Sequence, residues 1–201
     1  GTEKLKKLLN VTDNSYFLTE TNKENLSFAL EISKKLGLKK NLLMKTIKNF
    51  KGLRYRQQII LKKKFLTIIN DSKSTSFSSS IGVLKASPKI FWLLGGLRKK
   101  GDKFNLPKKY FNNISAFIYG KDKKFFNKKL KGKIKCQNFD NLDNALKKVL
   151  MIVKKKKFIH QTILFSPCAA SFDSFKNFED RGLYFNKLIK KYLDGTKKIN
   201  I

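Results

Sequence analysis

The chain has 201 residues, 41% hydrophobic and 12% aromatic, so it can bury a real core and is not a disordered polypeptide. No apolar run approaches the roughly 18 residues of a membrane span, and the first residues lack the hydrophobic stretch of a signal peptide. We therefore expect a cytoplasmic protein with no membrane attachment. Cys136 and Cys168 lack the spacing of a metal or redox motif, which disfavours a disulfide framework or a zinc site.

The formal net charge is +32, from 46 Lys and Arg against 14 Asp and Glu. Clustered cations bind nucleic acid by releasing its counterions, and residues 121–130 mix lysines with aromatic side chains. Only four of the 46 cations are arginine, which is the better group for reading phosphates and guanines. We favour a solvated lysine surface without specific nucleic-acid binding. A lysine-rich, non-catalytic nucleic-acid-binding α/β module is the alternative.

The first fifty residues have a helical pattern. The spacing of Thr21 and Glu24 is that of a capping box, and the apolar residues that follow, which include Leu26, Ile32 and Leu36, recur on one face until Gly37. A second helix is predicted over 41–50, with Leu42, Leu43, Ile47 and Phe50 facing inward. Gly52 ends this part of the chain, and we place a domain boundary there, between 1–51 and 52–201.

Beyond Gly52 the pattern changes to that of strands. Residues 57–61 and 65–70 predict a hairpin joined by 62–64. Four more short apolar runs follow, each separated from the next by a helix-length segment: 89–96, 114–120, 133–139 and 160–166. Short buried strands that alternate with helices indicate an α/β fold with a mostly parallel sheet flanked by helices. Ligands bind such sheets at the carboxyl ends of the strands.

The first polar segment at a strand end is INDSKSTS, residues 69–76. Asp71, Lys73 and Thr75 alternate, so an extended backbone would put all three on one side. A carboxylate, an ammonium and a hydroxyl together suit a phosphate or a metal–nucleotide complex. The alternative is that Ser74 or Thr75 only caps the helix that follows.

The second segment is LLGGLRKKGDKF, residues 93–104. Its two adjacent glycines allow another backbone or a ligand to approach closely, and the cations behind them could hold a carboxylate or a phosphate. The spacing is not that of a Walker phosphate-binding loop. A plain turn with solvated lysines is the alternative.

The third segment is ILFSPCAASFDSFKNFEDRG, residues 163–182. Ser166 and Pro167 end a strand, small side chains follow, and Ser171 precedes a predicted helix whose free N–H groups could bind an anion. Three phenylalanines recur at a spacing that is ordinary for a core: Phe172, Phe175 and Phe178. The functional expectation therefore rests on the small residues and the hydroxyls.

These segments, in this order, resemble the C-terminal domain of the Mur ligases, and within that family the enzymes that add D-glutamate. The matching stretches are 50–58, 69–76, 93–104 and 164–182, and residues 21–37 are similar to the helix that closes the family's central ATPase domain. The resemblance implies a Rossmann-like C-terminal domain over 52–201, preceded by a helical remnant of the central ATP-binding domain over 1–51.

The family makes peptidoglycan precursors in the cytoplasm and so serves cell-wall biogenesis, cell shape and cell division. ATP phosphorylates a substrate carboxylate, and the amine of an amino acid attacks the acyl phosphate to form an amide. The resemblance thus implies an ADP-forming acid–D-amino-acid ligase that joins D-glutamate to UDP-N-acetylmuramoyl-L-alanine. It further implies ATP and Mg²⁺ as cofactors and a monomeric protein.

The resemblance also assigns roles by position. The residues expected on the nucleotide side are Asn25, Arg56, Asp71 and Lys73, with Lys73 and Arg56 catalytic. The residues expected around D-glutamate are Thr75, Lys99, Ser171 and Phe178, with Phe172 contributing backbone contacts. A lysine would pair with a substrate carboxylate and the two hydroxyls would donate hydrogen bonds to it.

The chain departs from the family pattern at several positions. Tyr55 stands where the family usually has His, Ser76 stands where Asn is common, and Cys168-Ala169 stands where Ala-Cys is usual. The segment after Gly96 is one residue longer than in the family, so Lys100 could take the role expected of Lys99. The family's GTNGKT phosphate loop and its magnesium ligands are not in this sequence, so we expect a C-terminal part of the enzyme that holds no metal and is inactive alone.

Overall fold

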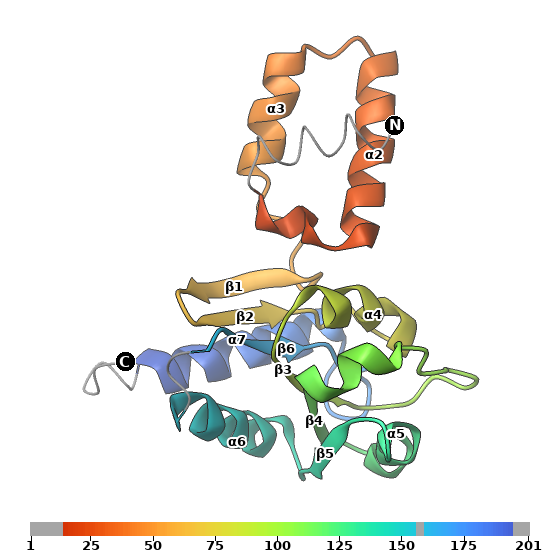
Figure 1. The fold of residues 1–201 in the computed structure, drawn as a ribbon, viewed down its shortest axis with the longest axis vertical. Coiled ribbons are helices and arrows are strands. Elements are labelled where there is room, and N and C mark those ends of the chain that lie inside the picture. The colour runs from red at the N-terminus through yellow and green to blue at the C-terminus, as the bar shows by residue number, and fades with distance from the viewer. Residues whose placement is uncertain (1–13, 156–158, 195–201) are drawn as a thin grey trace. The chain divides into compact units, whose positions relative to one another are not determined.

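The computed structural model describes residues 14–155 and 159–194. It divides the chain into two compact units, Gly1–Leu53 and Arg54–Ile201, called unit 1 and unit 2 below. Figure 1 shows that unit 1 is helical and that unit 2 contains the sheet. No helix in the described part of the chain combines the length and the apolar character needed to cross a membrane.

Unit 1 contains the short 3-10 helix η1 (Ser15–Leu18) and the helices α2 (Glu20–Lys35) and α3 (Lys40–Asn49). The capping box expected at Thr21 is wrong, because Thr19 is the N-cap and its Oγ1 accepts the Asn22 N–H at 3.4 Å. Thr21 therefore lies inside the first helical turn. Gly37, with φ of +69°, follows the end of α2 as expected from its freedom to adopt a left-handed conformation.

The core of unit 1 is small. Its buried members are Phe17, Leu26 and Ile47, with Leu43 packed against them. Several apolar residues that the helical pattern placed inward are instead exposed: Ile32 (59%), Leu36 (71%) and Leu42 (59%). Periodicity correctly predicted an apolar face, but it did not show how much of that face another element would cover.

Unit 2 is built on one six-stranded sheet with the strand order β1-β2-β6-β3-β4-β5. The strands are β1 (Gln58–Lys63), β2 (Leu66–Asn70), β3 (Ile90–Gly95), β4 (Ile114–Tyr119), β5 (Lys135–Asn138) and β6 (Gln161–Phe165). β1 and β2 form an antiparallel hairpin, and all other pairs are parallel. The predicted α/β fold with a mostly parallel sheet is confirmed.

Helices cover both faces of the sheet. They are α4 (Phe77–Ala86), the 3-10 helix η2 (Lys108–Asn113), α5 (Lys123–Leu130), α6 (Leu142–Lys155) and α7 (Phe178–Asp194). One core packs α4 and α5 around Trp92, and the other packs α6 and α7, where the rings of Phe165 and Phe185 stack at 4.3 Å. Successive residues of a strand pack into opposite cores, because side chains alternate between the two faces of the sheet.

Two local expectations near the strand ends are wrong. The helix expected directly after Ser171 begins only at Phe178, where Asn177 Oδ1 accepts the Asp180 N–H at 2.7 Å and caps it. The residues between form turns, since the N–H groups of Ser174 and Phe175 both donate to the Ser171 carbonyl. Phe172 is therefore 71% exposed and does not belong to the core.

The segment after β2 is not extended either. A turn in which the Ser74 N–H donates to the Asp71 carbonyl at 2.9 Å follows the strand. Asp71 is consequently buried, Lys73 half-buried and Thr75 exposed, so the three do not share one side. The helix α4 then starts after Ser76, rather than after Ser74 or Thr75.

Candidate functional site

The carboxyl ends of β2, β6 and β3 lie side by side at one edge of the sheet, because these parallel strands are neighbours in the order given above. Each strand leads into one of the segments that the sequence singled out. We call them the β2 loop (71–76), the β6 loop (166–177) and the β3 loop (96–107). Segments that lie far apart along the chain thus meet at one place; Asp71 and Ser166, for example, are 95 residues apart.

Backbone hydrogen bonds hold these loops together. The Asp71 N–H donates to the Phe165 carbonyl at 2.7 Å, which ties the β2 loop to the end of β6. Leu97 and Ala170 exchange two hydrogen bonds of 3.1 and 2.9 Å, which tie the β3 loop to the β6 loop. The three loops therefore form one bonded layer above the sheet edge.

Asp71 is the buried acid of this layer, with 5% of its surface exposed. Its Oδ1 accepts the Gln57 N–H at 3.0 Å, and its Oδ2 accepts the Ser166 hydroxyl at 2.6 Å. Burial raises the pKa of Asp71 from 3.8 to about 7, although these hydrogen bonds and the charges of Arg56 and Arg181 oppose the rise. The carboxyl is thus poised to change its charge near neutral pH.

A chain of hydroxyls lies behind Asp71. Ser166 Oγ lies 2.5 Å from Ser80 Oγ, which in turn lies 2.9 Å from Ser74 Oγ and 2.9 Å from Cys168 Sγ. Burial raises the pKa of the Cys168 thiol, so this sulfur stays protonated. This network of hydroxyls gives hydrogen-bond partners to polar groups that would otherwise be buried without them. It also fixes the Ser166 hydroxyl that donates to Asp71.

Lys73 is held by an aromatic ring. Its Nζ lies 3.6 Å from the centroid of the Phe178 ring, and its N–H donates to the Tyr55 carbonyl at 2.9 Å. Tyr55 is buried with φ of +59°, and its ring packs against Gly182, where a Cβ would lie only 2.3 Å from it. A cation–π contact of this kind restrains the ammonium without neutralising it.

The other predicted site residues occupy different environments. Arg56, Thr75, Lys99 and Lys100 are exposed, whereas Ser171 is buried. Thr75, Lys99 and Ser171 therefore lie on three adjacent loops. Asn25 lies on α2 in unit 1, where it lines a pocket of about 420 Å³. It is therefore not one of the residues that the loops of unit 2 bring together.

Sequence reasoning missed two kinds of residue here. Ser166 and Ser80 were not distinguished from other serines, since only the tertiary structure brings them to Asp71. Arg181 is fully buried and hydrogen-bonds to two loops. The sequence could have singled out Arg181, because it is the only arginine after Arg98 in a chain whose cations are nearly all lysine.

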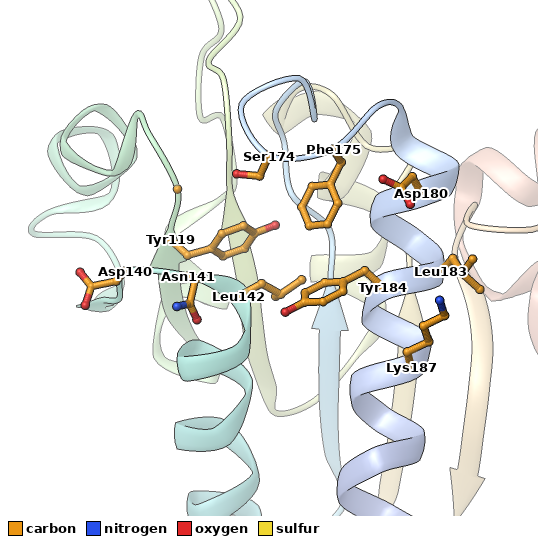
Figure 2. Close-up of a pocket in the computed structure, with 11 residues that line it drawn as sticks. Tyr119, Asp140, Asn141, Leu142, Ser174, Phe175, Asp180, Leu183, Tyr184 and Lys187 are labelled. Atoms are coloured by element: carbon orange, nitrogen blue, oxygen red, sulfur yellow. The ribbon is translucent and has the colours of Figure 1, made fainter.

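Another pocket, of about 460 Å³, lies at the carboxyl end of β4 and is lined in part by Ser174 and Phe175 of the β6 loop (Figure 2). Tyr119, Phe175 and Tyr184 supply aromatic walls, with Asp180 and Lys187 from α7. None of the predicted site residues lines it. The described residues include no group of three or more His, Cys, Asp or Glu side chains that could hold a metal ion.

No family model matches the chain. UDP-N-acetylmuramoylalanine–D-glutamate ligases of Francisella tularensis, including those of subspecies tularensis and novicida, are 37% identical over 188 residues, which is 91% of this chain and 44% of the relative. The chain thus spans less than half the length of the curated relatives it matches.

Solved structures show the same fold at lower identity. The chain is similar to the UDP-N-acetylmuramate–alanine ligase MurC of Thermotoga maritima, with a TM-score of 0.62 and 15% identity over 88% of this chain and 39% of that one. It is also similar to MurF of Acinetobacter baumannii (TM-score 0.59, 17% identity, 86% and 38% covered) and to the Thermotoga maritima MurF solved with ADP (TM-score 0.57, 16% identity, 88% and 39% covered). In sequence the chain is thus similar to these D-glutamate ligases, and in fold it is similar to the Mur ligases MurC and MurF.

Proposed function

We propose that the chain is the C-terminal part of an ADP-forming ligase that joins D-glutamate to UDP-N-acetylmuramoyl-L-alanine in peptidoglycan precursor synthesis. The 37% identity to ligases of that name supports this substrate pair. The observation that carries the proposal is the convergence of the β2, β3 and β6 loops, because these loops hold most of the residues assigned to the nucleotide and to D-glutamate.

On the nucleotide side we assign Arg56, Asp71 and Lys73 in unit 2, together with Asn25 in unit 1. ATP would supply the phosphoryl group that turns the substrate carboxylate into an acyl phosphate. Charge on a transferring phosphoryl group is stabilised by cations already in position. The Lys73 ammonium, restrained over the Phe178 ring, and the exposed Arg56 guanidinium fit that task.

On the amino-acid side we assign Thr75, Lys99, Ser171 and Phe178, with backbone contacts from Phe172. Lys99 would pair with one carboxylate of D-glutamate, and the two hydroxyls would donate hydrogen bonds. Lys99 and its neighbour Lys100 are both exposed on the β3 loop, and the separate variants Lys99→Ala and Lys100→Ala identify the one that binds.

We assign unit 1 to the central ATP-binding domain and unit 2 to the glutamate-binding domain. In this proposal the phosphate loop and the Mg²⁺ ligands belong to the rest of a longer, monomeric, cytoplasmic enzyme. The chain alone would then be inactive, since phosphoryl transfer needs all these groups in one geometry.

The test is ADP release by the full-length protein that contains this chain, with ATP, Mg²⁺ and UDP-N-acetylmuramoyl-L-alanine. We expect release that depends on D-glutamate and not on L-glutamate, and a loss of roughly 100-fold or more in Lys73→Ala, as for removal of a group that stabilises developing charge. Release that ignores D-glutamate would refute the proposal.

A second candidate function is the nucleic-acid-binding module. The observation that favours it is a basic pocket of about 570 Å³ formed by α5, the two residues before it and the β3 loop. It is lined by Phe125, one acid and six cations: Asp122, Arg98, Lys121, Lys123, Lys124, Lys128 and Lys129. Titration of a short DNA at several salt concentrations tests it. Tight binding with a steep salt dependence would support this function, whereas binding lost at physiological salt would indicate nonspecific attraction only.

A further inference from the structure

One buried side chain hydrogen-bonds to two loops of the candidate site and lies beside the third. Arg181, on α7, is 1% exposed. Its Nη2 donates to the Ser72 carbonyl of the β2 loop at 2.7 Å and to the Ala169 carbonyl of the β6 loop at 3.0 Å. A Cβ built on Gly96, where the β3 loop begins, would lie 3.5 Å from Nη1. The guanidinium thus fills the space where the loops meet.

The same bonds reach the residues assigned to the reaction. Arg181 Nε donates to Ser72 Oγ at 3.1 Å, and that hydroxyl donates to the Phe178 carbonyl at 2.8 Å. Ser72 lies between Asp71 and Lys73 in the chain, and Phe178 carries the ring beneath the Lys73 ammonium. None of these hydrogen bonds of Arg181 goes to Lys73 or Ser171, so they act on those residues through the backbone of the loops.

Stability alone does not account for an arginine at this position. Burial lowers the pKa of Arg181 by penalising its charged form, and no carboxylate of the described residues lies within ion-pair distance. Its Nη1 has no hydrogen-bond partner in the described part of the chain. The more distant carboxyls of Asp173 and Asp71 offset only part of the cost of burying this charge, and an apolar side chain of similar volume would avoid that cost.

What arginine supplies is a rigid planar fork with several donors in fixed directions. Its Nη2 bonds one carbonyl on each of two loops, and its Nε bonds the Ser72 hydroxyl, so the three acceptors must lie at set positions relative to one another. A lysine has a single flexible ammonium and cannot reproduce this geometry.

We propose that Arg181 is a positioning residue: it fixes the β2, β6 and β3 loops against one another and thereby sets the places of Lys73 and Ser171. The effect on substrate rests on the proposed ligase function, but the effect on the loops does not. The two can therefore be tested separately, with Arg181→Met and Arg181→Lys as variants and Arg54→Met as the matched control. Arg54 is exposed and lies outside the site.

The first test is hydrogen exchange of backbone amides in this chain. In both Arg181 variants we expect exchange at least about tenfold faster at Lys73, Leu97 and Ala170, whose N–H groups bond between segments. Amides of the sheet interior, such as that of Trp92, should keep their protection. The Arg54→Met variant should match the wild type. Unchanged exchange in the loops would overturn the proposal.

The second test is steady-state kinetics in the full-length protein. We expect the KM for D-glutamate to rise tenfold or more and kcat to fall, because a displacement of about 1 Å can cost roughly 100-fold in rate. The KM for UDP-N-acetylmuramoyl-L-alanine should stay unchanged, which a general loss of folding would not produce. Rescue of the wild-type KM by lysine would contradict the need for a fork.

The outcomes separate the two proposals. If the wild-type protein shows no D-glutamate-dependent activity while the loop amides respond as expected, the ligase assignment fails and the positioning role of Arg181 stands. If activity is present and neither the loops nor the KM for D-glutamate changes, the positioning role fails alone. If Arg181→Met does not fold, the same readouts in Arg181→Lys decide.

Discussion

The two units of the chain both contain amphipathic helices, but they bury their apolar side chains to different degrees. In unit 2, side chains such as Trp92 and Phe165 are fully buried between the sheet and its helices. In unit 1, Phe28 on the amphipathic helix α2 and Leu36 at its C-cap are each 71% exposed. Unit 2 therefore holds its own core, whereas unit 1 presents the kind of apolar surface that marks an interaction site.

The largest expected effect on stability comes from creating a cavity in the core of unit 2. Trp92→Ala removes a fully buried ring and its 2.8 Å hydrogen bond to the Ser166 carbonyl, and it should lower the free energy of unfolding by about 5 kcal/mol. Urea denaturation measures this. Met151→Ala, at a 58% exposed position on α6, should change the free energy by less than about 0.5 kcal/mol. Equal effects would show that the core is not packed as described.

The second effect is a dependence of stability on pH from Asp71. Its pKa is raised from 3.8 to about 7 in the folded protein, so between these values the folded state binds a proton that the unfolded state has lost. Stability should therefore fall as pH rises from about 4 to about 7, by about 4 kcal/mol, and the loss should be complete above that range. Urea denaturation at several pH values tests this.

The control for this dependence is Asp71→Asn, which resembles the protonated acid in shape and cannot ionise. Its free energy of unfolding should lack this pH-dependent fall and exceed that of the wild type at pH 8. A wild-type curve parallel to that of the variant between pH 4 and 7 would show that Asp71 ionises normally.

A smaller effect is expected from the contact between Lys73 and Phe178. A double-mutant cycle with Phe178→Leu and Lys73→Met should give a coupling energy of about 1 kcal/mol, as for a partly desolvated cation–π pair. Thermal or urea unfolding of the four proteins supplies the values. Additive effects would mean that the ammonium does not rest on the ring.

The smallest effect is expected in unit 1. Phe28→Ser should change the stability of this chain by less than about 0.5 kcal/mol, since the ring is mostly exposed. In the full-length protein the same change should destabilise by 1 kcal/mol or more if the rest of the central domain covers α2, as the proposed function implies. Equal, negligible effects in both would mean that this face stays uncovered.

Much of the fold could be predicted from local patterns. The strand predicted over 89–96 is observed as Ile90–Gly95, and the one over 114–120 as Ile114–Tyr119. The errors lie where long-range contacts override local preference. Phe172 follows a helical spacing, yet turns tied to Ser171 leave it in solvent, and no local pattern reports such turns.

The amino-acid sequence by itself determined the alternation of strands and helices and the identity of the three polar segments at the strand ends, because apolar periodicity and small or polar residues at strand ends act over short distances. Only the tertiary structure decided that Asp71 is buried against Ser166 and that Arg181 turns inward to join the loops. Those properties depend on partners about 100 residues away in the chain, whose approach is set by the strand order of the sheet and the packing of α7.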